Sequence, residues 1–284
     1  MSFKIVRTVA EHRAQIAAWR REGARVALTP TMGALHDGHL SLVAMARRVA
    51  DRAVATIFVN PTQFGAGEDL ATYPRNEARD AGLLAEAGCD MLFAPPLDEV
   101  YPPGFATEVR VRGLTGCLCG AARPGHMDGV AQVVTKLLNQ AGADFAIFGE
   151  KDWQQLAVIR RLARDLDIPT EILGAPILRE ADGLAMSSRN RYLTAEERAI
   201  APALHRALSA ARAKIARGQP LAEACAAGGA AILAAGFAKL DYFEARHGES
   251  LALLEAPDPA GRLFAAAHLG HARLIDNVKL GAGE

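Results

Sequence analysis

The sequence predicts an α/β protein with a mainly parallel sheet, followed by a smaller α+β domain. Short apolar runs of strand type alternate with helical patterns up to about residue 177, as in parallel strands joined by helices. The run at 53–60 is apolar throughout, which indicates a strand buried on both faces. After residue 194 come alanine-rich helical segments and then three strand-like runs. We therefore place a first domain at 1–177 and a second at 178–284.

The elements of the first domain carry their own start and stop signals. Thr8 and Glu11 have the spacing of a capping box, ahead of a helix that Gly23 ends. Asn76 and Gly88 bound a later helix in a similar way. Apolar periodicity predicts the other elements: strands at 25–31, 53–60, 89–95, 143–149 and 169–178, a peripheral strand at 107–113, and helices at 39–50, 128–142 and 152–167.

The second domain begins with helices and ends with strands. Thr194 and Glu197 form another capping box, and Pro202 marks a break or a new first turn in the helical stretch behind it. Gly228 and Gly229 weaken the helical pattern that follows. The predicted elements here are a helix at 221–236 and a small antiparallel sheet of the runs at 239–246, 262–269 and 272–280.

The composition excludes several classes of protein. Lysine plus arginine and aspartate plus glutamate number 32 each, so the basic excess of a general nucleic-acid or membrane-surface binder is missing. No apolar stretch reaches the ~18 residues of a membrane span, and the N-terminal segment lacks the apolar core of a signal peptide. The four cysteines include no CxxC pair and fit buried, reduced thiols. We expect a cytoplasmic protein.

The string "PTMGALHDGHLSL" places two histidines between a strand and a helix. Unpaired N–H groups and partial positive charge at the start of a helix attract phosphate. Gly33 and Gly38 allow close backbone approach, and the imidazoles of His36 and His39 donate hydrogen bonds to phosphate oxygens. A metal site is the rival interpretation, but only Asp37 stands nearby as a third ligand. Two solvated loop histidines are the remaining alternative.

Further strings in the same order resemble one enzyme family. They are "FVNPTQF" at 58–64, "RPGHMDGV" at 123–130, "FGEKDWQQL" at 148–156, "MSSRN" at 186–190 and "IDN" at 275–277. "HDGH" is similar to the HxGH signature of the adenylyl-transferring superfamily, and the whole set resembles the pantothenate synthetase (pantoate–β-alanine ligase) family. The resemblance implies a Rossmann-like catalytic domain with a smaller domain as a lid. It also implies ATP-dependent condensation of pantoate with β-alanine, through pantoyl adenylate, to pantothenate, AMP and pyrophosphate.

The resemblance implies an ATP site built from three segments. His36, His39, Lys151 and Arg189 are the expected catalytic residues, chiefly as stabilisers of phosphate charge, with His39 the usual proton donor. "MSSRN" stands where the superfamily has a mobile lysine-containing loop, and Lys151 suits phosphate while Asp152 suits ribose hydroxyls or the helix N-cap. The full expected ATP-binding set is Met32, Gly33, Ala34, Leu35, His36, Asp37, Gly38, His39, Gly149, Glu150, Lys151, Asp152, Leu178, Met186, Ser187, Ser188 and Arg189.

The other substrates are assigned in the same way. Gln63 and Gln155 match the family's pantoate-binding glutamines, and Gln63 also matches its β-alanine position. An amide both donates and accepts, which suits a hydroxy acid. Arg123 and His126 are expected to border this site, although a surface turn accounts equally well for His126. We make no assignment for Gln154, because a helical glutamine is usually a surface residue.

The resemblance also implies magnesium and a homodimer. Asp80 aligns with an acidic position near the metal, but Arg79 precedes it where some relatives have a second acid. A nucleotidyltransferase for another acceptor and a non-catalytic nucleotide-binding module are the competing functions. The two pantoate glutamines argue against the first, and the intact histidines and Lys151 argue against the second.

Overall fold

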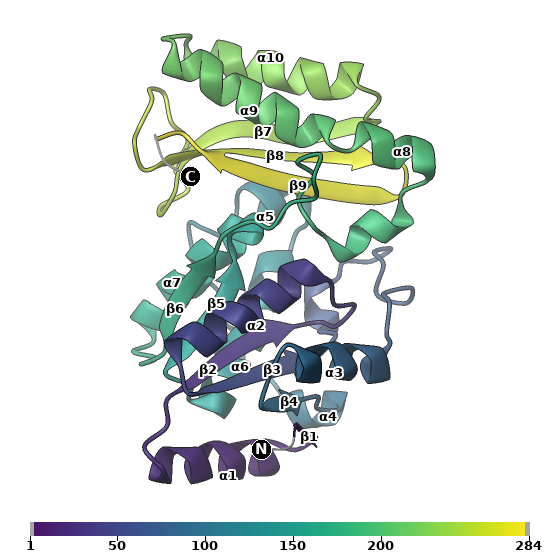
Figure 1. Cartoon of the computed structure of the whole chain (residues 1–284). Coiled ribbons are helices and arrows are strands. Elements are labelled where there is room, and N and C mark those ends of the chain that lie inside the picture. The colour runs from purple at the N-terminus through teal and green to yellow at the C-terminus, as the bar shows by residue number, and fades with distance from the viewer. Residues whose placement is uncertain (1–2, 282–284) are drawn as a thin grey trace.

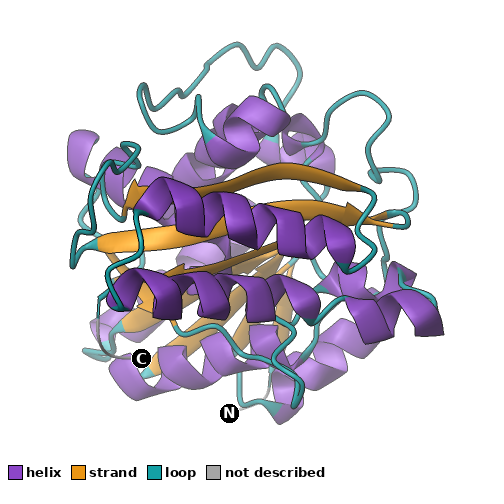
Figure 2. Cartoon of the chain, turned by 90° about the horizontal axis from the view of Figure 1, so that it is seen from above, coloured by secondary structure: helices purple, strands orange, loops and turns teal. Residues whose placement is uncertain are grey.

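The computed structural model describes residues 3–281, and in Figure 1 its two sheets lie one above the other. Residues 1–2 and 282–284, at the outer ends of the two predicted domains, lie outside the described part. The N-terminal part holds a six-stranded parallel sheet, and the C-terminal part holds a three-stranded antiparallel sheet. Seen from above, helices lie in front of the strands (Figure 2). The predicted fold class is therefore confirmed.

The large sheet places two loops of the sequence next to each other. Its strand order is β1-β4-β3-β2-β5-β6, so the neighbours of β2 are β3 on one side and β5 on the other. At such a switch point the loops after the two central strands diverge and leave a crevice at their carboxyl ends. The strands are β1 Lys4–Val6, β2 Val26–Thr31, β3 Arg52–Ile57, β4 Met91–Phe93, β5 Phe145–Gly149 and β6 Glu171–Ala175.

Helices cover both faces of this sheet. Buried residues of α1, α6 and α7 pack on one face, and those of α2 and α3 pack on the other. The α-helices of this part are α1 Val9–Arg21, α2 Asp37–Val49, α3 Glu77–Glu86, α4 Leu97–Val100, α5 Leu118–Ala122, α6 His126–Ala141 and α7 Trp153–Asp165. Three short 3-10 helices are η1 Pro61–Gln63, η2 Glu150–Asp152 and η3 Ser188–Tyr192.

The C-terminal part is a sheet with helices on its outer side, at the top of Figure 1. Gly228 and Gly229 lie within α10 because the helix packs tightly on the sheet: a Cβ at Gly228 would lie 2.4 Å from the ring of Phe243. The elements are α8 Ala195–Ile200, α9 Ala203–Ala216, α10 Leu221–Ala234, β7 Lys239–His247, β8 Gly261–Leu269 and β9 Ala272–Lys279.

The predicted caps are confirmed. Thr8 and Thr194 each close a capping box with the glutamate three residues later. The side chain of Asn76 accepts the N–H of Arg79 at the start of α3. These local signals locate the helix starts because each satisfies N–H groups that the helix cannot satisfy itself.

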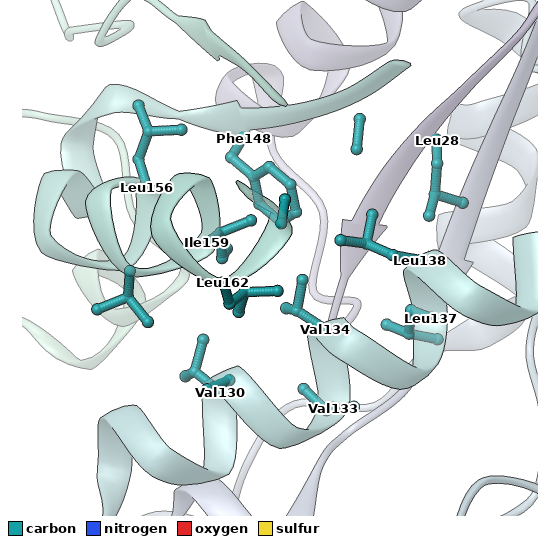
Figure 3. Packing of buried hydrophobic residues seen from close by; sticks show 14 of the residues in the cluster. Leu28, Val130, Val133, Val134, Leu137, Leu138, Phe148, Leu156, Ile159 and Leu162 are labelled. Carbon is teal, nitrogen blue, oxygen red and sulfur yellow. The ribbon is translucent and has the colours of Figure 1, made fainter. Parts of the chain in front are cut away.

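The centre of the N-terminal core lies between α6, α7 and the sheet. In Figure 3 the apolar side chains of α6 lie next to Ile159 and Leu162 of α7, with Phe148 beside them and Leu28 beyond Leu138. The α6 stripe has the spacing of one helical face: Val130, Val133, Val134, Leu137 and Leu138. The packing orients α6 and α7, and each of these helices begins at a loop that carries an expected site residue.

The peripheral strand predicted at 107–113 is wrong. This segment pairs with no strand, and the side chain of Gln132 in α6 accepts the N–H of Val109 at 2.9 Å. Val111 is buried, so the alternating pattern reflects packing on a helix rather than a place at a sheet edge. The short strand β1, whose three residues pair with β4, was not predicted.

The cysteines carry free thiols, as predicted. Cys89 and Cys119 are buried, whereas Cys117 and Cys225 are only partly buried. Within residues 3–281 we find no helix that is both long enough and apolar enough to span a bilayer.

His12 gives the fold a specific sensitivity to acid. Its ring is 1% exposed and stacks on Phe93 with 4.4 Å between centroids, and neither ring nitrogen has a hydrogen-bond partner among residues 3–281. Burial, helped by the charge of Arg13, lowers the pKa of His12 to about 4. Above pH ~6.5 both folded and unfolded states hold a neutral ring. Below it only the unfolded state takes up the proton, so stability falls towards pH 4 by about 3 kcal/mol in total.

We expect His12→Leu to remove this part of the acid sensitivity. Urea unfolding of both proteins at pH 7.5 and pH 5.0 checks it, because any packing cost of leucine is the same at both pH values. The wild type should lose about 2 kcal/mol more than the variant between the two conditions. Equal losses would show that His12 is not the group responsible.

Candidate active site

A cavity of about 820 Å³ lies between the two parts of the chain, at the carboxyl ends of β2, β3 and β5. Its walls come from the α2 turn, the η1 turn, the start of α7, the segment before η3, and the face of the small sheet towards the large one. This is the crevice that the strand order predicts.

His36 and His39 lie together at the start of α2. His36 is the N-cap, and its Nδ1 accepts the N–H of Gly38 at 3.1 Å. A nitrogen that accepts a hydrogen bond is unprotonated, so the proton of the neutral ring is on Nε2. The two rings lie 4.2 Å apart between centroids, and both line the cavity. Two imidazoles therefore stand at the positive end of a helix.

Both histidines are neutral at physiological pH. Burial, followed by the charges of Lys151 and Arg191, lowers the pKa of His36 to about 4. Burial and the neighbouring His36 lower the pKa of His39 to about 3. The Nδ1 of His39 is buried without a hydrogen-bond partner in the described part of the chain. As neutral rings, each can still donate one N–H hydrogen bond to an anion.

Asp80 holds the turn that precedes α2. It is 1% exposed, and its two carboxylate oxygens accept the N–H groups of Ala34 at 2.7 Å and Leu35 at 3.0 Å. The turn needs such an anchor because Gly33 and Ala34 both have positive φ, 83° and 54°. Asp80 does not line the cavity. Both carboxylate oxygens therefore accept backbone N–H groups of the turn, and this is the role that the structure shows for Asp80. Its expected place near magnesium stays a prediction.

The "GEKD" segment forms the turn between β5 and α7. Lys151 lines the cavity, and its Nζ lies 3.6 Å from the carboxylate of Asp152. Asp152 occupies the N-cap position of α7 but makes no capping hydrogen bond, so its carboxylate stays available to the cavity. Glu150 points elsewhere, with its carboxylate 3.7 Å from Arg262.

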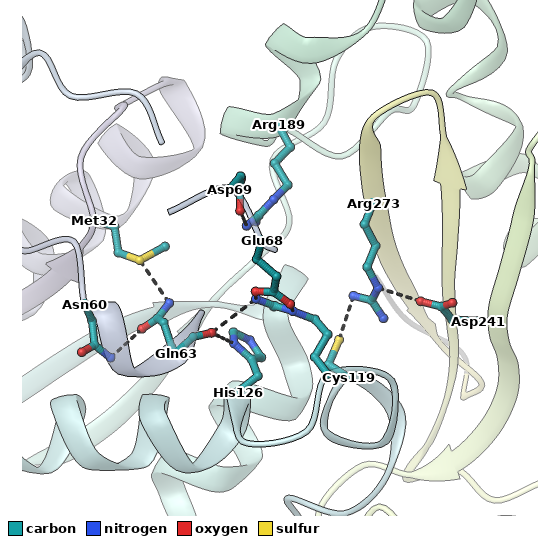
Figure 4. A network of polar contacts seen from close by, with 11 residues as sticks. Met32, Asn60, Gln63, Glu68, Asp69, Cys119, His126, Arg189, Asp241 and Arg273 are labelled. Atoms are coloured by element: carbon teal, nitrogen blue, oxygen red, sulfur yellow. Dashed lines mark hydrogen bonds and ion pairs between the residues drawn. The ribbon is translucent and has the colours of Figure 1, made fainter. Parts of the chain in front are cut away.

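The "MSSRN" segment borders the cavity ahead of η3. Ser187 caps η3 by accepting the N–H of Arg189 at 3.3 Å. The guanidinium of Arg189 forms an ion pair with Asp69 at 3.2 Å (Figure 4). Tyr73 forms a hydrogen bond with Ser188 that lowers its pKa, although burial raises that pKa more strongly. The loop around Asp69 and Tyr73 thus holds this segment.

Gln63 is fixed in orientation on the opposite wall. It is 8% exposed, its Oε1 accepts from Asn60 at 3.1 Å, and its Nε2 lies 3.0 Å from the sulfur of Met32 (Figure 4). Gln155 lines the same cavity from α7. The cavity also has an apolar lining, formed by Phe58, Met127, Val130, Val133, Val134, Leu137 and Phe148.

Arg123 and His126 are tied to the loop that carries Gln63. The Nε of Arg123 donates to Glu68 at 2.7 Å, and this hydrogen bond lowers the pKa of Glu68 to about 2. The Nδ1 of His126 lies 2.8 Å from the carbonyl of Gln63, while burial lowers the pKa of His126 to about 4. Both residues line the cavity, and His126 follows the exposed turn at Pro124 and Gly125. Its place beside the substrates stays a prediction.

Most of the expected site residues line this single cavity. Those that do are Met32, His36, Gly38, His39, Gln63, Arg123, His126, Gly149, Lys151, Asp152, Gln155, Leu178, Met186, Ser187, Ser188 and Arg189. Those that do not are Gly33, Ala34, Leu35, Asp37, Asp80 and Glu150. Leu35 is fully buried and Asp37 is exposed, so this second group shapes the turns or faces solvent.

Residues of the small sheet and Gln154 also contribute to the site, although neither was predicted. Lys239, Asp241 and Arg273 of the small sheet line the cavity. The spacing of Lys239 and Asp241 was a signal for this, because every second residue of a strand lies on the same face of the sheet. Gln154 is 4% exposed and holds α5 through Cys119, Leu114 and Cys117. Periodicity gave no sign of this role.

Within residues 3–281 no group of three or more histidine, cysteine, aspartate or glutamate side chains is arranged to hold a metal ion. The histidine turn therefore fits an anion better than a transition metal, because the third ligand that such a metal requires is missing.

Known proteins resemble this chain over nearly its whole length. A pantothenate synthetase of Paramagnetospirillum magneticum is 60% identical over 274 residues, 96% of each chain. One of Dinoroseobacter shibae is 55% identical, covering 98% of this chain and 99% of the relative. The crystal structure of pantothenate synthetase from Thermus thermophilus is 49% identical with a TM-score of 0.93, covering 98% of this chain and 100% of that one.

A more distant structure includes ligands. The pantoate-beta-alanine ligase of Francisella tularensis, complexed with beta-gamma ATP and beta-alanine, is 32% identical with a TM-score of 0.82 and 99% coverage of both chains. The family profile described as pantoate-beta-alanine ligase matches residues 4–279. The chain therefore belongs to the pantoate–β-alanine ligase family, whose members condense pantoate with β-alanine in an ATP-dependent reaction, and it is such a ligase.

Proposed function

We propose that ATP and pantoate bind side by side in this cavity and react there before β-alanine arrives. One observation carries the proposal: the turns bearing His39, Lys151 and Arg189 lie far apart in the sequence and meet around one cavity with Gln63 and Gln155. A carboxylate oxygen of pantoate attacks the α-phosphorus and pyrophosphate leaves. The amine of β-alanine then attacks the pantoyl carbonyl, and AMP leaves as the amine loses a proton.

The phosphates of ATP bind at the start of α2. Its free N–H groups and partial positive charge favour the polyanion, and the Nε2–H of His36 is the donor that the Gly38 contact leaves free. Lys151, Ser187 and Arg189 complete the phosphate site, and a phosphate oxygen replaces Asp69 on Arg189. Charge that builds on the departing pyrophosphate is then stabilised by donors already in place.

Pantoate lies between the two glutamines. The amides of Gln63 and Gln155 recognise its carboxylate and hydroxyls, and the apolar wall packs on its hydrocarbon part. Gln63 also contacts β-alanine, with Arg123 and His126 at the border. The Asn60 and Met32 contacts of Gln63 support this role, because they fix the direction of its amide.

Exchanging single side chains should separate the two substrate sites. We expect Gln155→Ala to raise the KM for pantoate about tenfold, the value of one lost hydrogen bond, with little change in the KM for ATP. Lys151→Ala should raise the KM for ATP instead. Steady-state kinetics of pantothenate formation check both, with the buried amide variant Gln140→Ala as the control. A Gln155→Ala variant that impaired ATP rather than pantoate would contradict the assignment.

Magnesium enters with ATP, held mainly by phosphate oxygens and water. Asp80 supports this arrangement only indirectly, through the backbone of the α2 turn. We expect Asp80→Asn to raise the KM for ATP roughly tenfold, because an amide N–H would face a backbone N–H. The magnesium concentration for half-maximal rate should stay the same at saturating ATP. A large shift in that concentration would indicate instead that Asp80 is a metal ligand.

The remaining expectations concern the cell and the assembly. We propose a homodimer in the cytoplasm and a division at residue 177/178, with the second part closing over ATP. Side chains of both parts around one cavity support the division. Light scattering of the purified protein tests the dimer.

A further inference from the structure

Asn277 in β9 connects the small sheet to the turn that carries Lys151. It is 1% exposed, and its Nδ2 donates to the carbonyl oxygens of Glu150 at 2.9 Å and Lys151 at 3.0 Å. Its Oδ1 accepts from the Nε of Arg262 at 2.7 Å. Because arginine only donates, this last bond determines which way the amide faces.

Arg262 is itself fixed by the residue that follows the turn. Its guanidinium lies 3.6 Å from the ring centroid of Trp153, and its NH2 lies 3.7 Å from the carboxylate of Glu150. The indole Nε1 of Trp153 donates to the carbonyl of Gly248 at 2.7 Å. The small sheet thus holds the turn from several sides.

The two carbonyls that Asn277 holds lie on either side of the Cα of Lys151. The Glu150 carbonyl belongs to the peptide plane before Lys151, and the Lys151 carbonyl belongs to the plane after it. Each plane is rigid, so only φ and ψ of Lys151 relate the two. Fixing the direction of both carbonyls fixes the direction in which the lysine side chain leaves the backbone. That side chain lines the cavity and is 19% exposed.

We infer that Asn277 is a positioning residue for Lys151, acting through the backbone carbonyls of the phosphate-binding turn. This rests on the proposed contact of Lys151 with ATP. Asn277 also lines the cavity, so the small sheet both borders the ATP site and holds the turn that carries Lys151. Placement matters because an error of about 1 Å in a catalytic group costs up to ~10²-fold in rate.

A second contact keeps the two parts docked without Asn277. Arg179, beyond β6, donates to the buried Asp276 of β9 at 2.7 and 3.0 Å. A variant of Asn277 is therefore expected to change the turn rather than to separate the sheets.

Asn277→Asp tests the inference with little change in size. The carboxylate still accepts from Arg262 but cannot donate to the two carbonyls, and it repels them. We expect pantoate-dependent ATP–pyrophosphate exchange to fall about 10- to 100-fold, with a circular dichroism spectrum like that of the wild type and a single cooperative melting transition. Asn277→Ala should lower the exchange rate to a similar extent. The control Gln140→Ala should keep the wild-type exchange rate, because Gln140 is a buried amide outside the cavity.

The decisive comparison is made in a Lys151→Met background. If Asn277 acts through Lys151, adding Asn277→Asp there lowers the exchange rate by less than about twofold. An equal loss in both backgrounds, or wild-type exchange by Asn277→Asp alone, would overturn the inference. Absence of exchange in the wild type would instead refute the proposed function, and wild-type exchange by Lys151→Met would refute the role of Lys151 and the inference with it.

Discussion

His39→Ala should lose most of the adenylation of pantoate, with a rate about 10² to 10³ lower, while the chain keeps its fold. The side chain stands at the start of α2 and lines the cavity, and its Nδ1 has no partner in the described chain. Its removal therefore leaves the hydrogen bonds from Asp80 to the turn intact. What is lost is a donor to the phosphate charge that grows as pyrophosphate leaves.

A neighbouring substitution on the same helix controls for this result. Ser41→Ala removes only a side-chain bond to the carbonyl of Gly38 and lies outside the cavity, so its turnover should be near wild type. The pKa of His39 is about 3, so His39 stays neutral near pH 6.5. The pH dependence of activity around pH 6.5 should therefore be the same with and without this histidine. Near wild-type turnover by His39→Ala would contradict the role given to this histidine.

Gly129→Ala should destabilise the fold and impair pantoate binding together. A Cβ on Gly129 of α6 would lie 2.2 Å from the carbonyl oxygen of Thr62 and 2.7 Å from the Cα of Gln63. The helix must then move away from η1, and the bond from Asn60 to the carbonyl of Gly129, now 3.1 Å, would be weakened. We expect a loss of about 2–3 kcal/mol in the free energy of unfolding and a higher KM for pantoate.

The same glycine-to-alanine substitution in a different helix should instead raise the free energy of unfolding. A Cβ on Gly82 of α3 meets nothing within 4 Å, so Gly82→Ala should stabilise the chain by up to ~1 kcal/mol through helix propensity. Urea unfolding of both variants and pantoate kinetics of Gly129→Ala are the measurements. A Gly129→Ala variant with wild-type stability and pantoate KM would show that η1 and α6 are not in close contact.

The sequence predicted the elements whose signals are local. Capping boxes and apolar periods gave nearly every helix and most strands, because each signal depends on neighbouring residues only. The segment at 107–113 alternates as a strand does, yet Gln132 from another element takes its N–H group. The three residues of β1 are too few to show a period, and their pairing with β4 is set by the whole sheet.

The candidate site was predicted as positions rather than as contacts. Motif resemblance put both Lys151 and Glu150 in the ATP-binding set, but Lys151 lines the cavity whereas Glu150 faces Arg262. It also placed Asp80 near a metal, whereas the structure gives both of its oxygens to the backbone. The role of Asn277 depends on β9 meeting a turn more than a hundred residues earlier in the chain, which no local pattern shows.

The central claim is that the histidine turn serves the reversible adenylation of pantoate. ATP–pyrophosphate exchange with labelled pyrophosphate and magnesium tests it most directly, with and without pantoate and in the absence of β-alanine. We expect exchange that requires pantoate, because the acid must react with ATP before any amine arrives. Folded protein that binds ATP but shows no exchange with pantoate present would contradict it.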